Sequence, residues 1–189
     1  PVGEILDDYE AENGLHIVKK RVPMGVIGII YESRPNVTAD AFGLCFKSGS
    51  AVILKGGREA FHSNKAVSDV LIAYGEKAGL PKGAVQFVNV PDRAAVDELI
   101  HLEGLVDVVI PRGGAGLIKN VVHNASVPVI ETGAGVCHTY VDAYANVLMA
   151  VEIAMNAKVN RPSTCNAMET LLVHKDIADA FLPAMLEAY

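Results

Sequence analysis

Hydrophobic positions along the chain alternate between short β-branched runs and longer stretches with helical spacing. Several of the short runs are apolar at consecutive positions, which is typical of strands covered on both faces. The predicted strands cover residues 24–31, 50–55, 84–90, 107–111, 127–131 and 138–142. The helical patterns between them lie near residues 37–47, 60–78, 92–102, 115–124 and 144–158. This alternation predicts an α/β fold with an open, doubly wound parallel sheet of the Rossmann-like type.

The last part of the chain adds a further strand and a further helix. The strand pattern TLLVH at 170–174 follows the segment around Cys165, and a helix is predicted from about residue 176 onward. Because no partner strand is evident in the chain, we interpret this part as the start of a second α/β domain. Its strand is expected to present an unpaired edge, which favours aggregation. The predicted boundary separates residues 1–150 from residues 151–189.

Composition and charge narrow the class of protein. The 189 residues are 51% hydrophobic and 20% charged, as expected of a soluble globular chain. The formal net charge is −6, and no stripe of Lys or Arg indicates a nucleic-acid partner. No apolar run approaches a membrane span and no signal-peptide pattern is present, so we expect a cytoplasmic protein without a membrane partner. Since the chain begins with Pro1 rather than Met, we expect a piece of a longer protein.

The cysteines and histidines point to a reducing compartment and to no metal site. Three cysteines cannot all pair, and the six histidines are scattered without ligand spacing. Cys45 lies in an apolar helical stretch and is interpreted as a buried small hydrophobe. Cys165 differs, because small polar residues surround it directly before an apolar strand. Its pattern leaves open both a reactive thiol and an unreactive, half-buried one.

Glycines and polar residues follow four of the predicted strands, in the segments ESRPN, GGRE, RGGAG and TGAG. In doubly wound sheets, ligands bind outside the carboxyl ends of the strands. Helix starts and tight turns explain some of these glycines. Four such segments after strands, called corners below, nevertheless favour a bound anion or nucleotide. The dinucleotide fingerprint G-x-G-x-x-G is absent, so the pattern alone indicates a phosphate-like ligand and no more.

Longer segments carry a more specific signal. They are VPMGVIGIIYESRPNVTADAFGLCFKSG, AVILKGGREAFHSN, VIPRGGAGLI, VIETGAGVCHTYVD and NAKVNRPSTCNAMETLLVH. In this order they resemble the γ-glutamyl phosphate reductase family of the aldehyde dehydrogenase superfamily. The resemblance implies NADPH-dependent reduction of L-glutamyl 5-phosphate to L-glutamate 5-semialdehyde with release of phosphate, in proline biosynthesis. It also implies an NADP-binding domain at 1–150 that lacks its N-terminal part, the opening of a catalytic domain at 151–189, and a homo-oligomer at full length.

The resemblance assigns catalytic roles to several residues. Cys165 matches the nucleophile, whose thiolate attacks the acyl phosphate and forms a thioester that accepts hydride. Asn36 matches the amide that, with the backbone N–H of Cys165, donates to the oxyanion, although a residue after Pro35 also suits a helix N-cap. Glu131 matches the glutamate that activates water in hydrolytic members, and its role here stays open between proton relay, ribose binding and loop support. Arg161 is expected to lower the thiol pKa, to hold the substrate phosphate, or to be a surface cation.

The resemblance also assigns a cofactor site. Lys55 matches the lysine that contacts the adenosine ribose or its 2′-phosphate, whereas its position alone indicates a solvated strand end. Arg58 adds a second cation that suits NADP over NAD. The commoner superfamily run is lysine, proline, small residue, glutamate; KGGRE departs from it and leaves the match of Glu59 open. Gly113 and Gly116 belong to RGGAG, whose backbone amides are expected to face the pyrophosphate or the nicotinamide end.

Two other functions stay open at this point. Glu131 is compatible with a hydrolytic or CoA-acylating aldehyde dehydrogenase, which the requirement for an acceptor would distinguish. The shortness of the chain is compatible with a nucleotide-binding module that has no turnover of its own. NADPH binding without thioester formation would favour that module.

Overall fold

The computed structural model describes residues 2–133 and 135–189, which form two compact units that meet between Thr132 and Gly133. The boundary expected from the sequence, near residue 150, differs from this one. The reason is that the predicted strand at 138–142 pairs within the second unit rather than with the strands of the first.

The first unit is built on a parallel sheet with the strand order β5-β4-β3-β6. Its strands are β3 (Val26–Tyr31), β4 (Ala51–Gly56), β5 (Val85–Phe87) and β6 (Val108–Arg112). Tyr31 pairs with both Gly56 and Arg112, so the carboxyl ends of the three longer strands lie at one edge. The chain adds strands on one side of β3 and then crosses to the other side. The gap between β3 and β6 is therefore the topological switch point, where such sheets bind ligands.

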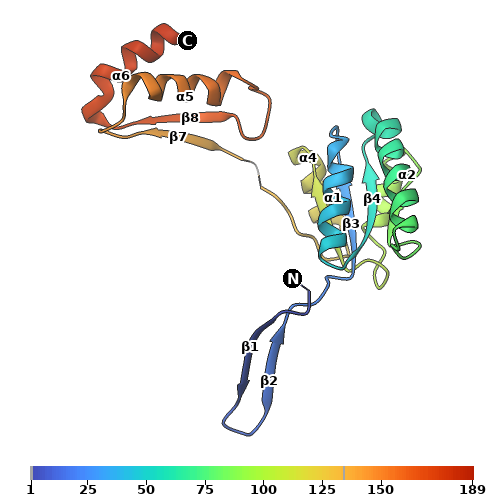
Figure 1. The fold of residues 1–189 in the computed structure, drawn as a ribbon. Helices are drawn as coiled ribbons and strands as arrows, with labels where there is room; N and C mark the ends of the chain where they lie inside the picture. The colour runs from blue at the N-terminus through green and yellow to red at the C-terminus, as the bar shows by residue number, and fades with distance from the viewer. Residues whose placement is uncertain (1, 134) are drawn as a thin grey trace. The chain divides into compact units, whose positions relative to one another are not determined.

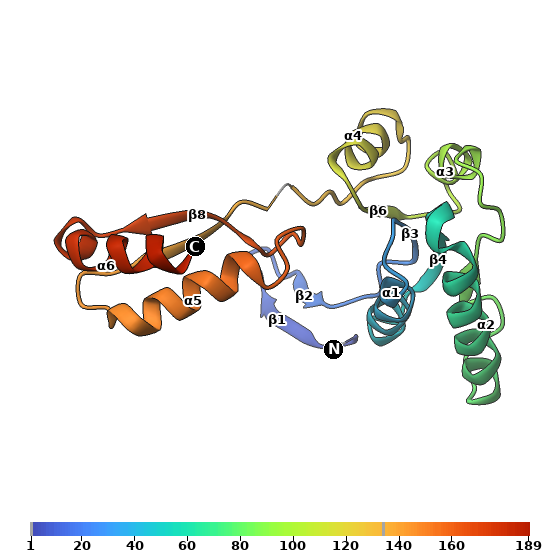
Figure 2. The ribbon, with the colours of Figure 1, turned by 90° about the horizontal axis from the view of Figure 1, so that it is seen from above.

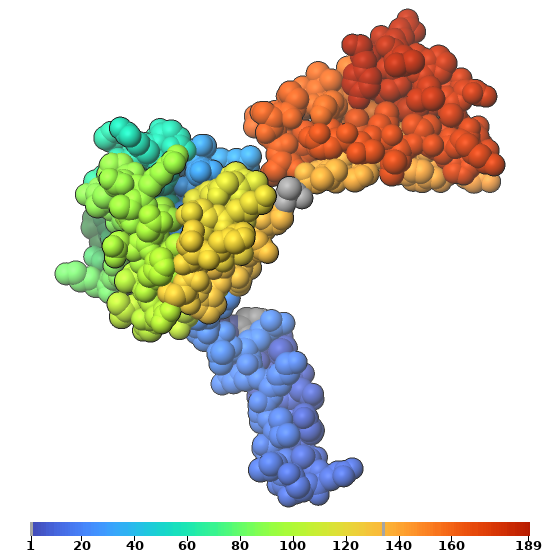
Figure 3. Space-filling model, turned by 180° about the vertical axis from the view of Figure 1, so that it is seen from behind, coloured from blue at the N-terminus to red at the C-terminus, as the bar shows by residue number. Residues whose placement is uncertain are grey.

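Helices cover both faces of this sheet. They are α1 (Asn36–Lys47) and α2 (Phe61–Lys77), with the short turn η1 (Arg58–Ala60), and α3 (Ala94–Leu99) and α4 (Ala115–Asn124). Figure 2 shows α1 and α2 on one side of the strands and α3 and α4 on the other, and in Figure 3 the surface of α3 and α4 hides the strands. Alternate residues of β3 fill the two cores, Ile29 and Tyr31 on the α1 side and Ile30 on the α4 side. The predicted doubly wound α/β fold is confirmed.

One predicted strand of this sheet, at 127–131, is reduced to a single bridge between Val109 and Val129. The segment still follows β6, because Val109 N–H donates to Pro128 at 2.8 Å and Ile130 N–H donates to Val109 at 2.9 Å. Pro128 has no N–H to offer a ladder, which limits the pairing. The strand prediction was therefore right about the place of this segment and wrong about its regularity.

The first unit also contains an antiparallel hairpin that the hydrophobic pattern did not predict. It joins β1 (Ile5–Glu10) to β2 (His16–Lys20), and every residue of both strands is exposed (Figure 1). Gly14 takes a φ of +82° in the connecting turn, directly after Asn13. An Asn-Gly pair between alternating runs is a hairpin signal that needs no buried face.

The second unit consists of a parallel pair of strands and two helices. They are β7 (Cys137–Val141), β8 (Met168–Val173), α5 (Val147–Val159) and α6 (Lys175–Ala188). Val141, Ala154 and Phe181 belong to their common core. The expectation that the last strand has no partner in the chain was wrong, because β8 pairs with β7 up to Val141 and Val173. Within the two described ranges, no helix is long and apolar enough to cross a membrane.

Candidate functional site

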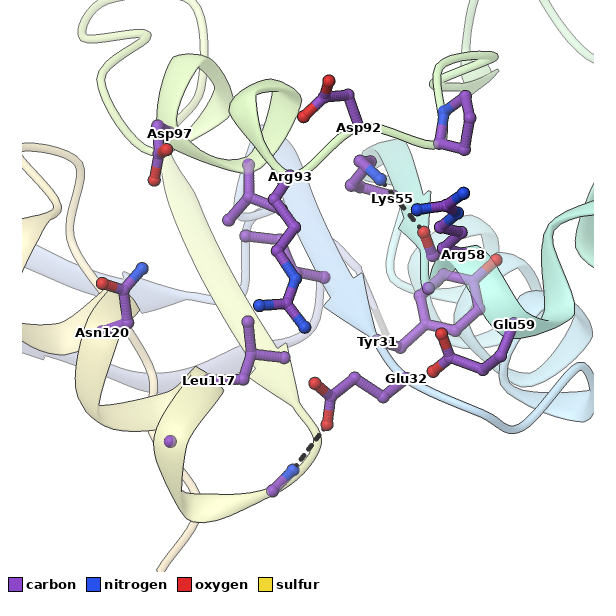
Figure 4. Close-up of a pocket in the computed structure, with 17 residues that line it drawn as sticks. Tyr31, Glu32, Lys55, Arg58, Glu59, Asp92, Arg93, Asp97, Leu117 and Asn120 are labelled. Atoms are coloured by element: carbon purple, nitrogen blue, oxygen red, sulfur yellow. Dashed lines mark hydrogen bonds between the residues drawn. The ribbon is translucent and has the colours of Figure 1, made fainter.

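A cavity of about 1220 Å³ opens in the first unit, at the carboxyl ends of β3 and β4 (Figure 4). Its walls come from these strand ends, the loop before α3 and the first turns of α4, the helix that follows β6, so it extends over the switch point between β3 and β6. The volume is of the size that proteins use for cofactors and other small ligands. Of the cofactor residues predicted from the sequence, Lys55, Arg58 and Gly116 line this cavity.

Lys55 is buried, with 3% of its surface exposed, so it is not the solvated strand end that its position suggested. Its Nζ donates a hydrogen bond to the carbonyl of Gly56 at 3.1 Å. Burial lowers the pKa of Lys55, and the carboxylates of Asp92 and Glu59 oppose that shift. A lysine desolvated in this way gains most from an anionic ligand, because water does not compensate its charge.

Glu59 faces the same cavity and connects two of its loops. Its carboxylate accepts a hydrogen bond from the hydroxyl of Ser33 at 2.9 Å. Its own backbone N–H, together with Ser33, lowers the pKa of Glu59. Ser33 has a φ of +53° and is, among the residues that the structure describes, the one non-glycine residue with positive φ. This hydrogen bond therefore ties a strained residue after β3 to the segment after β4.

The glycine-rich turn before α4 is already bonded to a carboxylate of the chain. The N–H of Gly114 donates to Glu32 Oε2 at 2.8 Å (Figure 4). Gly113 does not line the cavity; a Cβ at that position would lie 2.8 Å from the carboxyl carbon of Glu32 and 2.9 Å from Leu117. The glycine thus allows close packing, and a side chain here would have to displace the ends of Glu32 and Leu117. The segment ESRPN was predicted to lie at this edge of the sheet, but Glu32, its first residue, was not singled out.

Further polar residues of the cavity were also missed. Asp92 and Arg93 enter from the loop before α3, and Asn120 enters from α4 (Figure 4). The signal was available, because the segment PDRAA follows the predicted strand at 84–90 in the same way that the four glycine-containing corners follow theirs. This corner has no glycine and was passed over. With Arg93 the cavity contains three cationic side chains.

Two predicted catalytic residues of the first unit are not among the described residues that line the cavity. Asn36 is the first residue of α1, which Pro35 precedes without a side-chain cap, and its amide donates to Asp40 Oδ2 at 3.0 Å. The helix-cap interpretation of Asn36 is therefore wrong. Glu131 is exposed and follows the bridge at Val129.

Cys165 lies in the second unit, in the turn that leads into β8, and its thiol is free and exposed. The turn is held by backbone atoms and by Thr164, whose N–H and hydroxyl both donate to the carbonyl of Arg161, at 3.1 and 2.8 Å. Arg161 itself is exposed. An exposed thiol in a short turn is accessible to a substrate, which the half-buried alternative would not be.

The first residue of β7 and the segment before it lie directly against this turn. Cys137 Sγ donates to the carbonyl of Cys165 at 3.5 Å, and a Cβ on Gly135 would lie 3.0 Å from the same oxygen. The TGAG corner includes Ala134, which is outside the described residues. Within the described ranges, no group of three or more His, Cys, Asp or Glu side chains is arranged to hold a metal ion.

Comparison with known proteins identifies the family. Residues 3–189 match the aldehyde dehydrogenase family. The chain belongs to this family. Curated relatives within it include the γ-glutamyl phosphate reductases of Moorella thermoacetica, 58% identical over 188 residues, and of Lacticaseibacillus casei, 59% identical over 177 residues. The chain is covered to 100% and 94% in these comparisons and spans 45% and 42% of the two relatives, less than half of their length.

Solved structures of aldehyde dehydrogenases agree with the fold. The crystal structure of γ-glutamyl phosphate reductase from Thermotoga maritima has a TM-score of 0.84 and 49% identity, over 99% of this chain and 45% of that chain. An acetylating aldehyde dehydrogenase from Geobacillus thermoglucosidasius has a TM-score of 0.76 at 23% identity, over 90% of this chain and 38% of that one. The second likeness shows the shared fold alone.

Proposed function

We propose that this chain forms the NADP-binding part and the nucleophile segment of an enzyme that reduces L-glutamyl 5-phosphate to L-glutamate 5-semialdehyde. The observation that carries the proposal is the name γ-glutamyl phosphate reductase, shared by curated relatives that are 55–59% identical over nearly the whole chain. In this proposal the full-length protein acts in proline biosynthesis, lies in the cytoplasm and forms a homo-oligomer.

Cys165 is the proposed nucleophile. Its thiolate attacks the acyl carbon, the carbon–oxygen bond to phosphate breaks, and phosphate leaves with the bonding electron pair. The product is a thioester, which accepts hydride more readily than an oxygen ester because its carbonyl has less resonance stabilisation. The backbone N–H of Cys165 and the amide of Asn36 are the proposed donors to the oxyanion, and donors of this kind contribute about 3 kcal/mol in other enzymes.

The cavity of the first unit fits a nicotinamide dinucleotide. It lies at the switch point of the sheet, and it combines the buried ammonium of Lys55 with the cations of Arg58 and Arg93. The bound cofactor would supply hydride to the thioester. Lys55 would bind the adenosine ribose or its 2′-phosphate, and Arg58 a 2′-phosphate, which is the basis for proposing NADP rather than NAD. The turn around Gly113 and Gly116 is proposed to face the pyrophosphate or the nicotinamide end.

Glu131 and Arg161 complete the proposal. Glu131 is proposed to relay protons, to bind the nicotinamide ribose or to support the loop that follows it, since activation of water against the thioester would waste the substrate. Arg161, which is exposed in the turn of Cys165, is proposed to hold the phosphate of the substrate.

The acceptor requirement tests this function. NADP⁺ reduction by the gene product in full would be followed with glutamate semialdehyde as donor, with phosphate, without phosphate, and with CoA. We expect turnover that depends on phosphate and disappears in Cys165→Ala. Turnover without phosphate would indicate a hydrolytic aldehyde dehydrogenase with Glu131 as base, and turnover that requires CoA would indicate an acylating one.

A further inference from the structure

A cluster of buried polar side chains lies behind the wall of the cavity, between the sheet and helices α1 and α2. Thr38, Asn64 and Ser68 have no exposed surface. The hydroxyls of Tyr31 and Thr38 are 2.6 Å apart, and Thr38 Oγ1 donates to Asn64 Oδ1 at 3.5 Å. Tyr31 is itself a residue of the cavity wall. A polar chain therefore runs from the cofactor cavity to Asn64 in the first turn of α2.

The amide of Asn64 is only partly satisfied by this cluster. In the part of the chain that the structure describes, Asn64 Nδ2 and Ser68 Oγ are the buried side-chain atoms without a hydrogen-bond partner. Burial of an unpaired polar group costs free energy, because its hydrogen bonds to water are lost and not replaced. The hydrogen bond from Thr38 uses the carbonyl oxygen of Asn64 and leaves the buried NH2 group unexplained. A polar group kept at such a cost requires a specific explanation.

The backbone of Gly56 lies directly against this amide. A Cβ at position 56 would overlap Asn64 Nδ2 and lie 3.0 Å from Asn64 Cγ. Gly56 is the last residue of β4, pairs with Tyr31 and lines the cavity. The amide of Asn64 therefore occupies the space that a side chain at position 56 would need. This contact lies at the end of β4, where the chain turns into residues 57–59 of the cavity wall.

Gly56 also provides the hydrogen-bond acceptor of the buried Lys55. Its carbonyl accepts the hydrogen bond from Lys55 Nζ at 3.1 Å (Figure 4). A displacement of the Gly56 peptide would move this acceptor and with it the ammonium group. We propose that Asn64 is a positioning residue of the cofactor site, which fixes the turn at Gly56 and thereby the direction of the Lys55 ammonium. The inference rests on the proposed function, because it takes Lys55 as a ligand of the cofactor.

Ser68 provides the matched control. It lies one turn further along α2, is equally buried and also has an unpaired polar atom, but the three atoms nearest to a Cβ built on Gly56 all belong to Asn64. A role in packing alone would make Asn64→Ala and Ser68→Ala equivalent apart from their effects on stability. A positioning role predicts weaker cofactor binding in Asn64→Ala alone.

The test is a fluorescence titration of NADPH against the gene product in full, with thermal unfolding as the check on folding. We expect Asn64→Ala to raise the Kd and the KM for NADPH at least about fivefold with a nearly unchanged kcat, and Ser68→Ala to leave both binding parameters unchanged. Equal Kd values for the two folded variants would overturn the inference. Absence of NADPH binding by the wild type would overturn the proposed function, and the inference with it.

A second variant changes Gly56, the other residue of the pair, and provides the test if Asn64→Ala does not fold. Gly56→Ala introduces the Cβ that overlaps the amide, so we expect it to weaken NADPH binding by a similar factor. In the double variant G56A/N64A, the new methyl group occupies the space that the amide leaves. The double variant should therefore bind NADPH more tightly than Gly56→Ala alone. Additive losses, which would indicate two independent sites, would contradict the coupling of Gly56 and Asn64.

Discussion

The carboxyl edge of the first sheet and the turn around Cys165 present their key residues in different ways. At the sheet edge, Lys55 is buried and bonded to a carbonyl, Glu59 is bonded to Ser33, and Glu32 is bonded to Gly114. In the Cys165 turn, the thiol is exposed, and the hydrogen bonds that hold the turn end on backbone carbonyls. The comparison separates a proposed binding site made of hydrogen-bonded side chains from a proposed nucleophile held in a backbone turn. Substitutions should therefore affect binding in the first region and chemistry in the second.

The largest expected effect is that of Cys165→Ala on turnover. Without the thiolate no thioester forms, so we expect the rate to fall by a factor on the order of 10³ or more. Because the cofactor cavity belongs to the first unit, the Kd for NADPH should stay within about twofold of wild type. Steady-state assays and a binding titration measure the two quantities. Cys137→Ala is the control, because it removes only a weak S–H donor and should keep most of the activity. A parallel loss in both variants would contradict the assignment of the nucleophile.

The second effect concerns Lys55→Ala, which removes the buried cation of the cavity. Hydrogen bonds to charged groups contribute about 1.5–3 kcal/mol, so the Kd for NADPH should rise about 10- to 150-fold. Isothermal titration calorimetry would measure it. Lys47→Ala, at the exposed end of α1, is the matched removal of one positive charge and should change the Kd little. Equal effects of the two variants would show that Lys55 acts only through net charge.

The third effect is on stability and distinguishes two glycines of the same turn. Gly113→Ala places a Cβ against Glu32 and Leu117, and overpacking of this kind costs about 1–3 kcal/mol. Gly116→Ala meets no atom within 4 Å and replaces a glycine inside α4, so it should stabilise by up to about 1 kcal/mol. Urea unfolding of both variants checks the difference. If Gly113→Ala is as stable as Gly116→Ala, the inference that a side chain at position 113 disturbs the packing against Glu32 is wrong.

The smallest effect near neutral pH is the pH dependence of NADPH binding. Because burial lowers the pKa of Lys55, its ammonium loses its charge at a lower pH than an ordinary lysine. Binding that uses this charge is complete below the lowered pKa and weakens as the pH rises through it. In Lys55→Arg the loss should move to higher pH, since a guanidinium stays protonated to above pH ~12. Titrations across the alkaline range would show this shift. Identical profiles for lysine and arginine would contradict a direct role of the ammonium.

Much of the fold could be predicted because its signals are local. The strands at 24–31 and 50–55 were found from consecutive apolar residues, which only a sheet covered on both faces requires. The hairpin of β1 and β2 was missed because it has no buried face to create a hydrophobic pattern, and its turn signal, Asn13-Gly14, was not used. The pairing of β7 with β8 was missed because it joins residues about 30 positions apart, and no local pattern encodes such a partner.

The site could be predicted only in part, for a related reason. Lys55 and Arg58 were found from the resemblance, but the burial of Lys55 depends on what covers β4. Glu32 follows the end of β3 and Arg93 lies in the loop before α3, and the strand order brings these two segments to one cavity. The contact between Gly56 and Asn64 joins the end of a strand to the first turn of a helix, and neither residue has a local signal for it.

The central claim is that Cys165 forms a thioester and that a cofactor in the cavity of the first unit exchanges hydride with it. The most direct test follows both events in one reaction. The gene product in full would be incubated with glutamate semialdehyde and NADP⁺ in the absence of phosphate, then digested and analysed by mass spectrometry. Because hydride loss from the thiohemiacetal to NADP⁺ leaves a thioester whose phosphate acceptor is absent, we expect a glutamyl adduct on the peptide that contains Cys165. The adduct should require NADP⁺ and should disappear when phosphate is added. An adduct on another residue, or none with NADP⁺ present and phosphate absent, would contradict the account.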